Sequence, residues 1–239
     1  SRLAMVQTEM AAKAIKTAFP SVPIEINGYE TKGDQQLNRS LAAFGSKGAF
    51  TKELETAMLE GRIDLAVHSA KDLPVELSEG LTVGAVLQRG DSRDVWVSLR
   101  KEFSEIEACR GKVIVGTGSL RRALQIRQMC NGVEIRDIRG NVPTRLKKLS
   151  EELFDGIILA AAGLKRLGYL SDACDETGCF EAEGQTFFYE ILPKEQFFPA
   201  AGQGIIAVET RQHDCEECMH AIHDEQTWQM FLAERAFLK

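Results

Sequence analysis

Several features that would assign a protein quickly to a class are missing from this chain of 239 residues. No apolar run approaches the roughly 20 residues that span a bilayer, so we expect no membrane segment. Low-complexity tracts and internal repeats are absent too, which argues against fibrous and solenoid architectures. Aromatic residues make up only 7% of the chain, whereas 44% of residues are hydrophobic and 27% are charged. These values are typical of a soluble globular protein.

The first residues lack the apolar stretch and the small-residue cleavage site of a secretory signal peptide, so we expect a cytoplasmic location. We interpret the six cysteines as reduced thiols, because a chain of this length buries enough apolar surface without disulfides. The same length favours two domains over one.

Charge is distributed unevenly along the sequence. The net charge is −6, yet residues 117–148 contain eight basic and two acidic side chains, a local charge of +6 that leaves −12 elsewhere. Positive charge confined to one stretch indicates a local anionic partner rather than a polyanion. No Phe, Tyr or Trp lies in 117–148, so the stacking side chains of an RNA surface are missing there. We expect a small anionic ligand and no nucleic acid.

Helical and strand patterns alternate along the chain. The first third predicts a helix that ends before Pro20, a strand at 22–28, a helix over 51–59 and a buried strand at 63–67. Further strands are predicted at 113–115, 133–135, 156–160 and 205–208, with helices from Ser119, from about Val142, up to Leu167 and over 226–237. Residues 171–187 are acidic and have no period, which predicts a loop or an irregular hairpin. The alternation indicates an α/β fold with parallel strands and crossover helices.

The most informative segment is the end of the strand at 63–67. His68, Ser69, Lys71 and Asp72 place four polar side chains within five positions. Ligands of parallel α/β sheets gather at such strand ends. Taken alone, the cluster is a weak signal and is more typical of a structural histidine beside a solvated lysine-aspartate pair.

Glycine-flanked basic residues occur in both halves of the chain. Upstream of the helix at 51–59, the sequence GSKG around Lys47 suggests an anion site, although the glycine spacing of a P-loop is missing. In the second half, the sequence GTGSLRR (116–122) leads a strand into a helix that Thr117 or Ser119 can cap. The free N–H groups of that helix end, with Arg121 and Arg122, would bind a carboxylate or phosphate. Further cationic groups follow at Arg139, Arg145 and Arg166. For any single arginine a surface or ion-pair role is the better interpretation, and only the set taken together favours an anion site.

Taken in order, these segments resemble those of the porphobilinogen deaminase family. The shared segments are GSKGAFTKELE (45–55), DLAVHSAKDLP (64–74), RGDSRD (89–94), GTGSLRR (116–122), RGNVPTRLKKL (139–149), ILAAAGLKRLG (158–168) and PAAGQG (199–204). So many ordered matches are more specific than any one motif. The resemblance implies two α/β lobes like those of periplasmic binding proteins, with a cleft between them. It maps domain 1 to 1–87 and 197–210, domain 2 to 88–196, and the start of a truncated third domain to 211–239.

The resemblance also implies an activity and a cofactor. Family members are transferases that deaminate porphobilinogen and join four units head to tail into hydroxymethylbilane, in tetrapyrrole (heme) biosynthesis. They extend a covalent dipyrromethane whose pyrroles carry acetate and propionate groups, and a monomer is expected. The family attaches this cofactor to a cysteine in a Gly-Gly-Cys loop. No cysteine here has that context, so we expect the attachment position beyond Lys239 and no covalent cofactor on these residues alone.

By resemblance, Asp72 is the catalytic carboxylate. Loss of ammonia leaves a cation on the substrate, and a carboxylate about 4 Å away contributes on the order of 4 kcal/mol at an effective dielectric constant near 20. The resemblance places the carboxylates of the cofactor and growing chain on Lys47, Ser69, Lys71, Thr117, Ser119, Arg121, Arg122, Arg139 and Arg145. It places Arg166 and Gln203 near the incoming porphobilinogen.

Two alternatives remain at this point. A two-lobed protein with a cationic site could be a non-catalytic carboxylate-binding module. Separately, residues 213–223 gather three histidines around a CxxC motif, which could attract zinc. A closed zinc site needs four converging ligands and no second CxxC is present, so we expect an ordinary helix and no metal.

Overall fold

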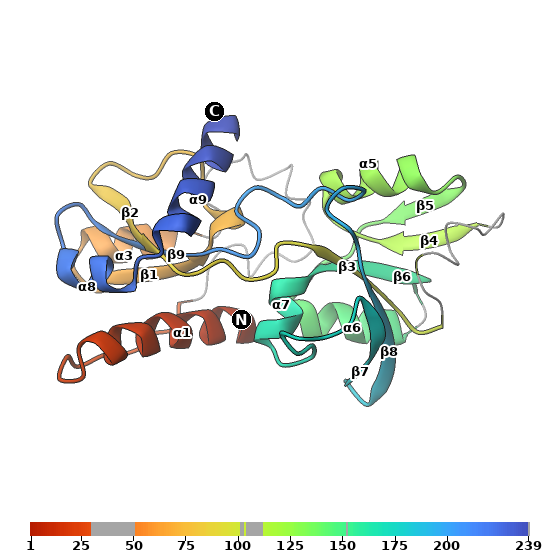
Figure 1. The fold of residues 1–239 in the computed structure, drawn as a ribbon, viewed down its shortest axis with the longest axis horizontal. Helices are drawn as coiled ribbons and strands as arrows, with labels where there is room; N and C mark the ends of the chain where they lie inside the picture. Colours follow the sequence, from red (N-terminus) through yellow and green to blue (C-terminus); the bar gives the residue numbers. More distant parts are fainter. Residues whose placement is uncertain (30–50, 101–102, 104–111, 152, 239) are drawn as a thin grey trace. The chain divides into compact units, whose positions relative to one another are not determined.

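The computed structural model describes residues 1–29, 51–100, 103, 112–151 and 153–238. The chain divides into two compact units (Figure 1): unit 1 comprises Ser1–Gly90 and Ala201–Lys239, and unit 2 comprises Asp91–Ala200. In the residues that the structure describes, each unit combines helices with one sheet, so the predicted α/β class is confirmed. No helix in the described part of the chain has the length and hydropathy needed to cross a membrane. Residues 211–238 pack within unit 1, and their assignment to a third domain stays a prediction.

The sheet of unit 1 has the order β1-β9-β2, formed by β1 (Leu65–Ser69), β9 (Ile206–Arg211) and β2 (Leu81–Val86). Both pairings are antiparallel, so the expectation of parallel strands is wrong for the described strands of this unit. The reason is topological, because β9 enters from the far end of the chain and runs between β1 and β2. The strand predicted at 22–28 is also wrong, since these residues form no strand. Pro23 lacks the N–H group that a paired strand would donate.

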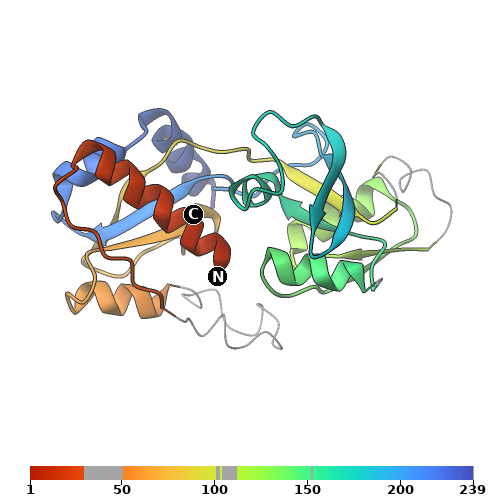
Figure 2. The same cartoon turned by 90° about the horizontal axis from the view of Figure 1, so that it is seen from below.

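Four α-helices in the described part of unit 1 cover both faces of its sheet. They are α1 (Arg2–Ala18), α3 (Lys52–Leu59), α8 (Glu216–Ile222) and α9 (Glu225–Leu238). Val67 of β1 packs in one apolar cluster with α1 and α8, whereas the next residue toward the N-terminus, Ala66, packs with α3 on the opposite face. The alternation of side chains along a strand produces this division. Figures 1 and 2 show α1 extended along the sheet.

Unit 2 has a six-stranded sheet in the order β5-β4-β6-β3-β8-β7. Its strands are β3 (Asp94–Ser98), β4 (Val113–Gly116), β5 (Val133–Arg136), β6 (Gly156–Ala160), β7 (Thr177–Ala182) and β8 (Gln185–Ile191). The predicted parallel pairing is confirmed for β4 with β5 and β6. In contrast, β3 runs antiparallel to β6 and β8.

The hairpin of β7 and β8 is regular, although the sequence predicted a loop or an irregular hairpin there. Its two-residue turn consists of Glu183 and Gly184, which have φ values of 50° and 74°. Positive φ at both positions is the geometry whose twist matches that of two antiparallel strands. Glutamate rarely adopts this conformation, so the composition of the segment concealed the turn.

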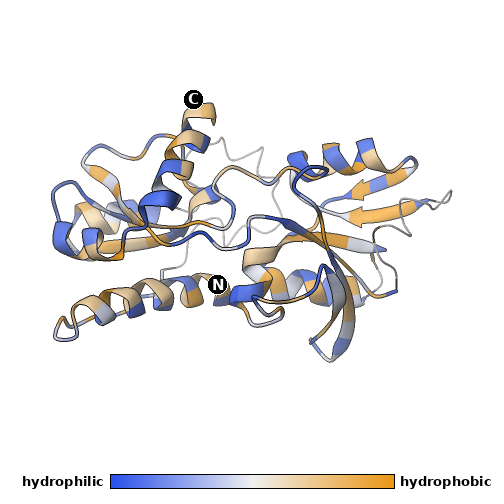
Figure 3. Ribbon diagram, viewed as in Figure 1, coloured by the Kyte–Doolittle hydropathy of each residue, from blue (hydrophilic) through white to orange (hydrophobic). Residues whose placement is uncertain are grey.

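Within the described residues of unit 2, three helices cover the sheet. α6 (Val142–Ser150) and α7 (Ala161–Arg166) pack on one face, and α5 (Leu120–Met129) packs on the other around the fully buried Trp96. Figure 3 shows apolar colour concentrated in strands such as β4, with polar colour interspersed along the helices. Because β3 is antiparallel to β6, the amino end of β3 lies at the same sheet edge as the carboxyl ends of β4 and β6. That edge carries most of the predicted basic residues.

Candidate functional site

Asp72 ends a short 3₁₀ turn, η2 (Ala70–Asp72), that follows β1 directly. The turn is fixed at both ends, because Ala70 N donates to Ile205 O at 3.0 Å and Leu73 N donates to Ala70 O at 3.3 Å. The Asp72 side chain itself is exposed, and no described residue donates a hydrogen bond to its carboxylate. The fold therefore presents an accessible carboxylate on an anchored backbone.

Two side-chain pairs secure the strand that leads into this turn. The amide of Gln7, a buried residue of α1, donates to Ser69 Oγ at 2.9 Å and accepts from it at 3.2 Å. His68 Nε2 lies 2.9 Å from Glu209 Oε2 of β9, and both side chains are buried. His68 therefore has a buried partner in Glu209, and the Ser69 hydroxyl is hydrogen-bonded to Gln7. The role of Ser69 as a carboxylate ligand stays a prediction, as does that of Lys71.

The PAAGQG segment packs against the same turn. Gly202 has a φ of 72°, and a Cβ atom placed on it would lie 2.9 Å from Lys71 N. Gly202 N donates to Glu234 Oε2 at 2.6 Å, and Glu234 also forms an ion pair with Arg89. Gln203 is 1% exposed, and its carbonyl accepts from Arg89 Nε at 3.0 Å. The structure thus brings Gln203 close to the Asp72 turn as part of a buried segment, and its role toward substrate remains a prediction.

In unit 2, the GTGSLRR segment forms the expected helix start. Ser119 is the N-cap of α5, with its Oγ accepting from Arg122 N at 3.4 Å. Thr117 is buried, and its Oγ1 accepts from Ser119 N at 3.1 Å. The two hydroxyls therefore shape the turn from β4 into α5, and Ser119 satisfies one of the free N–H groups of the helix.

The two arginines of that segment have different environments. Arg122 is buried, and its guanidinium donates to Asp94 Oδ1 and to Ile158 O. Arg121 is about one quarter exposed and lies 2.7 Å from Asp94 Oδ2. Both arginines therefore share one buried carboxylate at the start of β3.

Arg139 and Arg145 follow β5 at the same sheet edge. Arg139 Nε donates to Asp137 Oδ2 at 3.0 Å, and Arg145 Nε donates to Gly140 O at 2.7 Å. A Cβ atom on Gly118 would lie 2.6 Å from Asp137 Oδ1, so the loop after β4 and the loop after β5 are in contact. The structure thereby brings Arg139 near the GTGSLRR turn.

Arg166 ends α7, which follows β6. Burial lowers the pKa of its guanidinium to about 10, because a charged group loses hydration inside the protein. The side chain still carries its charge at neutral pH. Lys47, also predicted as a ligand, lies outside the described residues.

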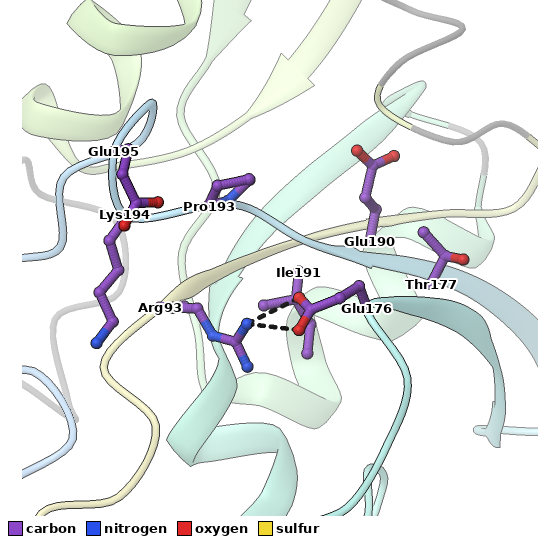
Figure 4. Close-up of a pocket in the computed structure, with 8 residues that line it drawn as sticks. All are labelled: Arg93, Glu176, Thr177, Glu190, Ile191, Pro193, Lys194 and Glu195. Carbon is purple, nitrogen blue, oxygen red and sulfur yellow. Dashed lines mark hydrogen bonds and ion pairs between the residues drawn. The ribbon is translucent and has the colours of Figure 1, made fainter.

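An ionic cluster surrounds Asp91 at the beginning of unit 2. Asp91 accepts hydrogen bonds from Arg93 Nε at 2.9 Å, from Arg93 Nη2 at 2.7 Å and from Lys165 Nζ at 3.1 Å. Burial by itself would raise the pKa of Asp91, but the hydrogen bonds from Arg93 and Lys165 outweigh it and hold the pKa well below its usual range. Arg93 also binds Glu176 at the wall of an open pocket (Figure 4). None of the predicted site residues lines this pocket.

Asp91→Asn should destabilise the protein by about 2 kcal/mol at pH 7, because charge-assisted hydrogen bonds contribute about 1.5–3 kcal/mol each. The folded pKa of Asp91 lies below the unfolded value of about 3.9, so its contribution is present above that pH and is lost as pH falls toward the folded pKa. The difference between wild type and variant should therefore shrink below about pH 4. Urea unfolding at pH 7 and pH 3 measures both values. Asp172→Asn, at an exposed aspartate of the same unit, is the control; equal effects of the two substitutions would contradict the prediction.

Metal binding gains no support from the described residues, where no group of three or more His, Cys, Asp or Glu side chains is placed to hold an ion. Residues 216–222 of the CxxC segment form the helix α8, as predicted from the sequence.

The sequence did not predict several residues that hold the site in place. Gln7, Asp94 and Glu209 bind the side chains of Ser69, Arg122 and His68, and Glu234 accepts from the backbone N–H of Gly202, next to Gln203. Asp94 had one available signal, because it lies in the RGDSRD segment, whose acidic residues have basic neighbours. Gln7 and Glu234 also lie in segments that resemble the family, LA..Q at 3–7 and AERAF at 233–237, whereas Glu209 carries no such signal.

Comparisons with known proteins point to the family that the sequence segments resemble. A family model described as "Porphobilinogen deaminase, dipyromethane cofactor binding domain" matches residues 1–219. The porphobilinogen deaminase of Syntrophus aciditrophicus (strain SB) is 41% identical over 242 residues, covering 100% of this chain and 73% of the relative. That of Shouchella clausii (strain KSM-K16) is 43% identical over 241 residues, covering 100% and 72%.

One solved structure supports the fold. The BenM effector binding domain with its effector benzoate matches with a TM-score of 0.50 at 10% identity, covering 96% of this chain and 86% of that one. At this identity the likeness concerns the fold alone. The family match and the two relatives, by contrast, extend through both units and include the segments around Asp72 and Arg121. The chain therefore belongs to the porphobilinogen deaminase family and contains its dipyrromethane cofactor-binding domain.

Proposed function

We propose that this chain deaminates porphobilinogen and condenses four units head to tail into hydroxymethylbilane, a step of tetrapyrrole synthesis. The observation that carries the proposal is Asp72, an exposed carboxylate on a backbone turn that is hydrogen-bonded at both ends, within a segment shared with the family. A carboxylate is the group that this chemistry requires, because deamination creates positive charge on the substrate.

The residues of unit 2 fit a dipyrromethane, whose acetate and propionate groups need cationic donors. The Arg121 side chain is about one quarter exposed, so its guanidinium is accessible to a ligand. Arginine forks match carboxylates bidentately. We propose that the carboxylates of the cofactor and product chain are held by Arg121, Arg139 and Arg145, with Thr117 and Ser119 shaping the loop. When bound, a dipyrromethane supplies the pyrrole position on which the product is built.

Asp72 acts on the porphobilinogen unit. Its carboxylate accepts the pyrrole N–H, stabilises the cation that remains after ammonia leaves, and accepts a proton during the condensation. At about 4 Å and an effective dielectric constant near 20, the electrostatic contribution is about 4 kcal/mol. Gly202 keeps the turn in place, because its missing side chain lets the PAAGQG backbone approach Ala70 and Lys71.

The proposal includes a monomeric, cytoplasmic protein that binds no nucleic acid. The five cysteines among the described residues are free, which supports a reducing location. The lack of aromatic side chains in 117–148 supports a small anionic ligand for the basic segment.

The test is incubation of the complete gene product with porphobilinogen. Ammonia release together with a linear tetrapyrrole is the expected result. Saturable binding of porphobilinogen without ammonia release would contradict the proposal and indicate a carboxylate-binding module. Mass spectrometry of the product distinguishes a tetrapyrrole from shorter condensation products.

Gly202→Ala should lower turnover about 10- to 100-fold, because small displacements of catalytic groups can cost that much. The new Cβ atom would lie 2.9 Å from Lys71 N and 3.0 Å from Ala70 C, so the backbone that carries Asp72 must shift. Gly61→Ala is the matched control, since Gly61 has a φ of 70° and nothing within 4 Å of the Cβ position. Both variants carry the same conformational strain. Steady-state kinetics in which both lose activity equally would contradict the role of close packing.

A further inference from the structure

Helix α9 packs against the turn that carries Asp72. Phe231 of α9 is 2% exposed and lies in one apolar cluster with Ala70 and Leu73. Ala70 begins the η2 turn and Leu73 follows its last residue, so these two side chains bracket the turn. Both ends of the turn therefore rest on the same apolar cluster as α9.

Arg235 lies about one helical turn after Phe231 and reaches the segment that follows η2. Its guanidinium lies 5.2 Å from the centre of the Phe231 ring, and its Nη2 donates to Pro74 O at 2.8 Å and to Val75 O. Residues 73–80 form neither helix nor strand, so these carbonyls receive no hydrogen bond from regular secondary structure. The side chain of Arg235 supplies those hydrogen bonds.

Arg235 is a half-buried cation that binds backbone instead of an acid. Among the described residues, its hydrogen-bond acceptors are the two carbonyls, and no carboxylate pairs with it. Burial lowers the pKa of its guanidinium, but the side chain still carries its charge at neutral pH. Hydrogen bonds from a charged donor are stronger than those from a neutral one. The contact is therefore suited to holding one stretch of main chain in place.

The preceding residue of α9 acts on the other side of the turn. Glu234 Oε2 accepts from Gly202 N at 2.6 Å. A Cβ atom on Gly202 would lie 2.9 Å from Lys71 N and 3.0 Å from Ala70 C, so this glycine is in close contact with the turn. Two consecutive residues of α9, Glu234 and Arg235, thus hold two segments that adjoin η2.

We propose that Arg235 is a positioning residue for the reaction, which holds Pro74 and Val75 so that the η2 turn presents Asp72 to the porphobilinogen unit. The inference rests on the proposed function. Arg235 touches no reacting atom, and its effect on turnover passes through Asp72. Because other side chains are proposed to bind the substrate and chain carboxylates, Arg235 should affect kcat more than KM.

Arg235→Met tests this role, because methionine keeps an unbranched side chain over the Phe231 ring and removes every donor. In the complete gene product, kcat should fall about 10- to 100-fold, the range for a small displacement of a catalytic group. KM should stay within about threefold of wild type, since substrate binding is retained. Arg235→Lys keeps a charged donor and should recover part of the lost kcat. Arg62→Met, the same change at an exposed arginine of unit 1, is the control and should leave both constants unchanged.

The Asp72→Asn background separates positioning from a general effect on the fold. If Arg235 acts through Asp72, adding Arg235→Met to Asp72→Asn should lower the remaining turnover by less than about threefold. A further loss as large as that in the wild-type background would overturn the proposal, because it would show that Arg235 acts independently of Asp72. A wild-type kcat in the single variant Arg235→Met would overturn it as well.

Amide hydrogen exchange gives a readout that needs no substrate. The amides of Ala70 and Leu73 are hydrogen-bonded, and in Arg235→Met they should exchange about tenfold faster than in wild type, with β4 of unit 2 unchanged. Equal exchange at 70–73 in both proteins would contradict the positioning role. A wild-type protein without turnover, in which Arg235→Met still speeds this exchange, would refute the proposed function and leave the support of the turn by Arg235 established.

Discussion

Replacing Asp72 by asparagine is expected to leave the fold intact and to lower turnover about a thousandfold. The loss follows from the charge, because about 4 kcal/mol of cation stabilisation corresponds to about three powers of ten in rate. The fold should survive because the Asp72 side chain is exposed and no described residue donates to it. Substitutions at such positions usually change stability by less than about 0.5 kcal/mol. Product formation and thermal denaturation measure the two effects.

Glu79→Gln is the matched control, since Glu79 is an exposed acid of the same unit and the substitution makes the same change of charge. It should alter neither turnover nor thermal stability. Asp72→Glu keeps the charge and displaces it by one methylene, so its turnover should lie between those of wild type and Asp72→Asn. A folded Asp72→Asn protein with turnover close to wild type would show that another group stabilises the cation.

The sequence predicts those parts of the fold that depend on local signals. Helix α5 and its Ser119 cap follow from a cap residue and the helical pattern after it, and the parallel pairing of β4, β5 and β6 follows from alternating elements. The antiparallel position of β9 could not be predicted. Strand pairing in unit 1 depends on which segment, distant in sequence, forms the central strand of the sheet. The apolar pattern of β9 is compatible with either a parallel or an antiparallel central strand.

The same contrast holds for the site. Asp72 is recognisable because polar side chains cluster at a strand end, but the groups that hold the site are distant in sequence. Glu209 is 141 positions from His68, and Asp94 is 28 positions from Arg122. The two arginines of GTGSLRR are alike in sequence. On a helix, however, consecutive side chains point about 100° apart, and this rotation gives Arg122 a buried environment and Arg121 a partly exposed one.

Gly156→Ala should be the most destabilising single-methyl addition in unit 2, at about 3 kcal/mol or more, the upper range for overpacking of a filled core. Gly156 begins β6, directly beside the indole of Trp96 on β3, and a Cβ atom there would overlap the six-membered ring. Trp96 is fully buried against α5, so the ring cannot move aside without disturbing the cluster around it. Urea unfolding measures the loss.

Two further variants separate steric overlap from a general effect of removing glycine. Gly28→Ala adds the same methyl group where nothing lies within 4 Å, and it should leave the free energy of unfolding within about 0.5 kcal/mol of wild type. Trp96→Phe removes the ring that the new Cβ atom would meet. Alone it leaves a cavity and destabilises, but combined with Gly156→Ala it should be more stable than the sum of the two single effects, because the methyl group occupies part of that cavity. Strictly additive effects would mean that Gly156 is required for its backbone conformation and not for the space it leaves to Trp96.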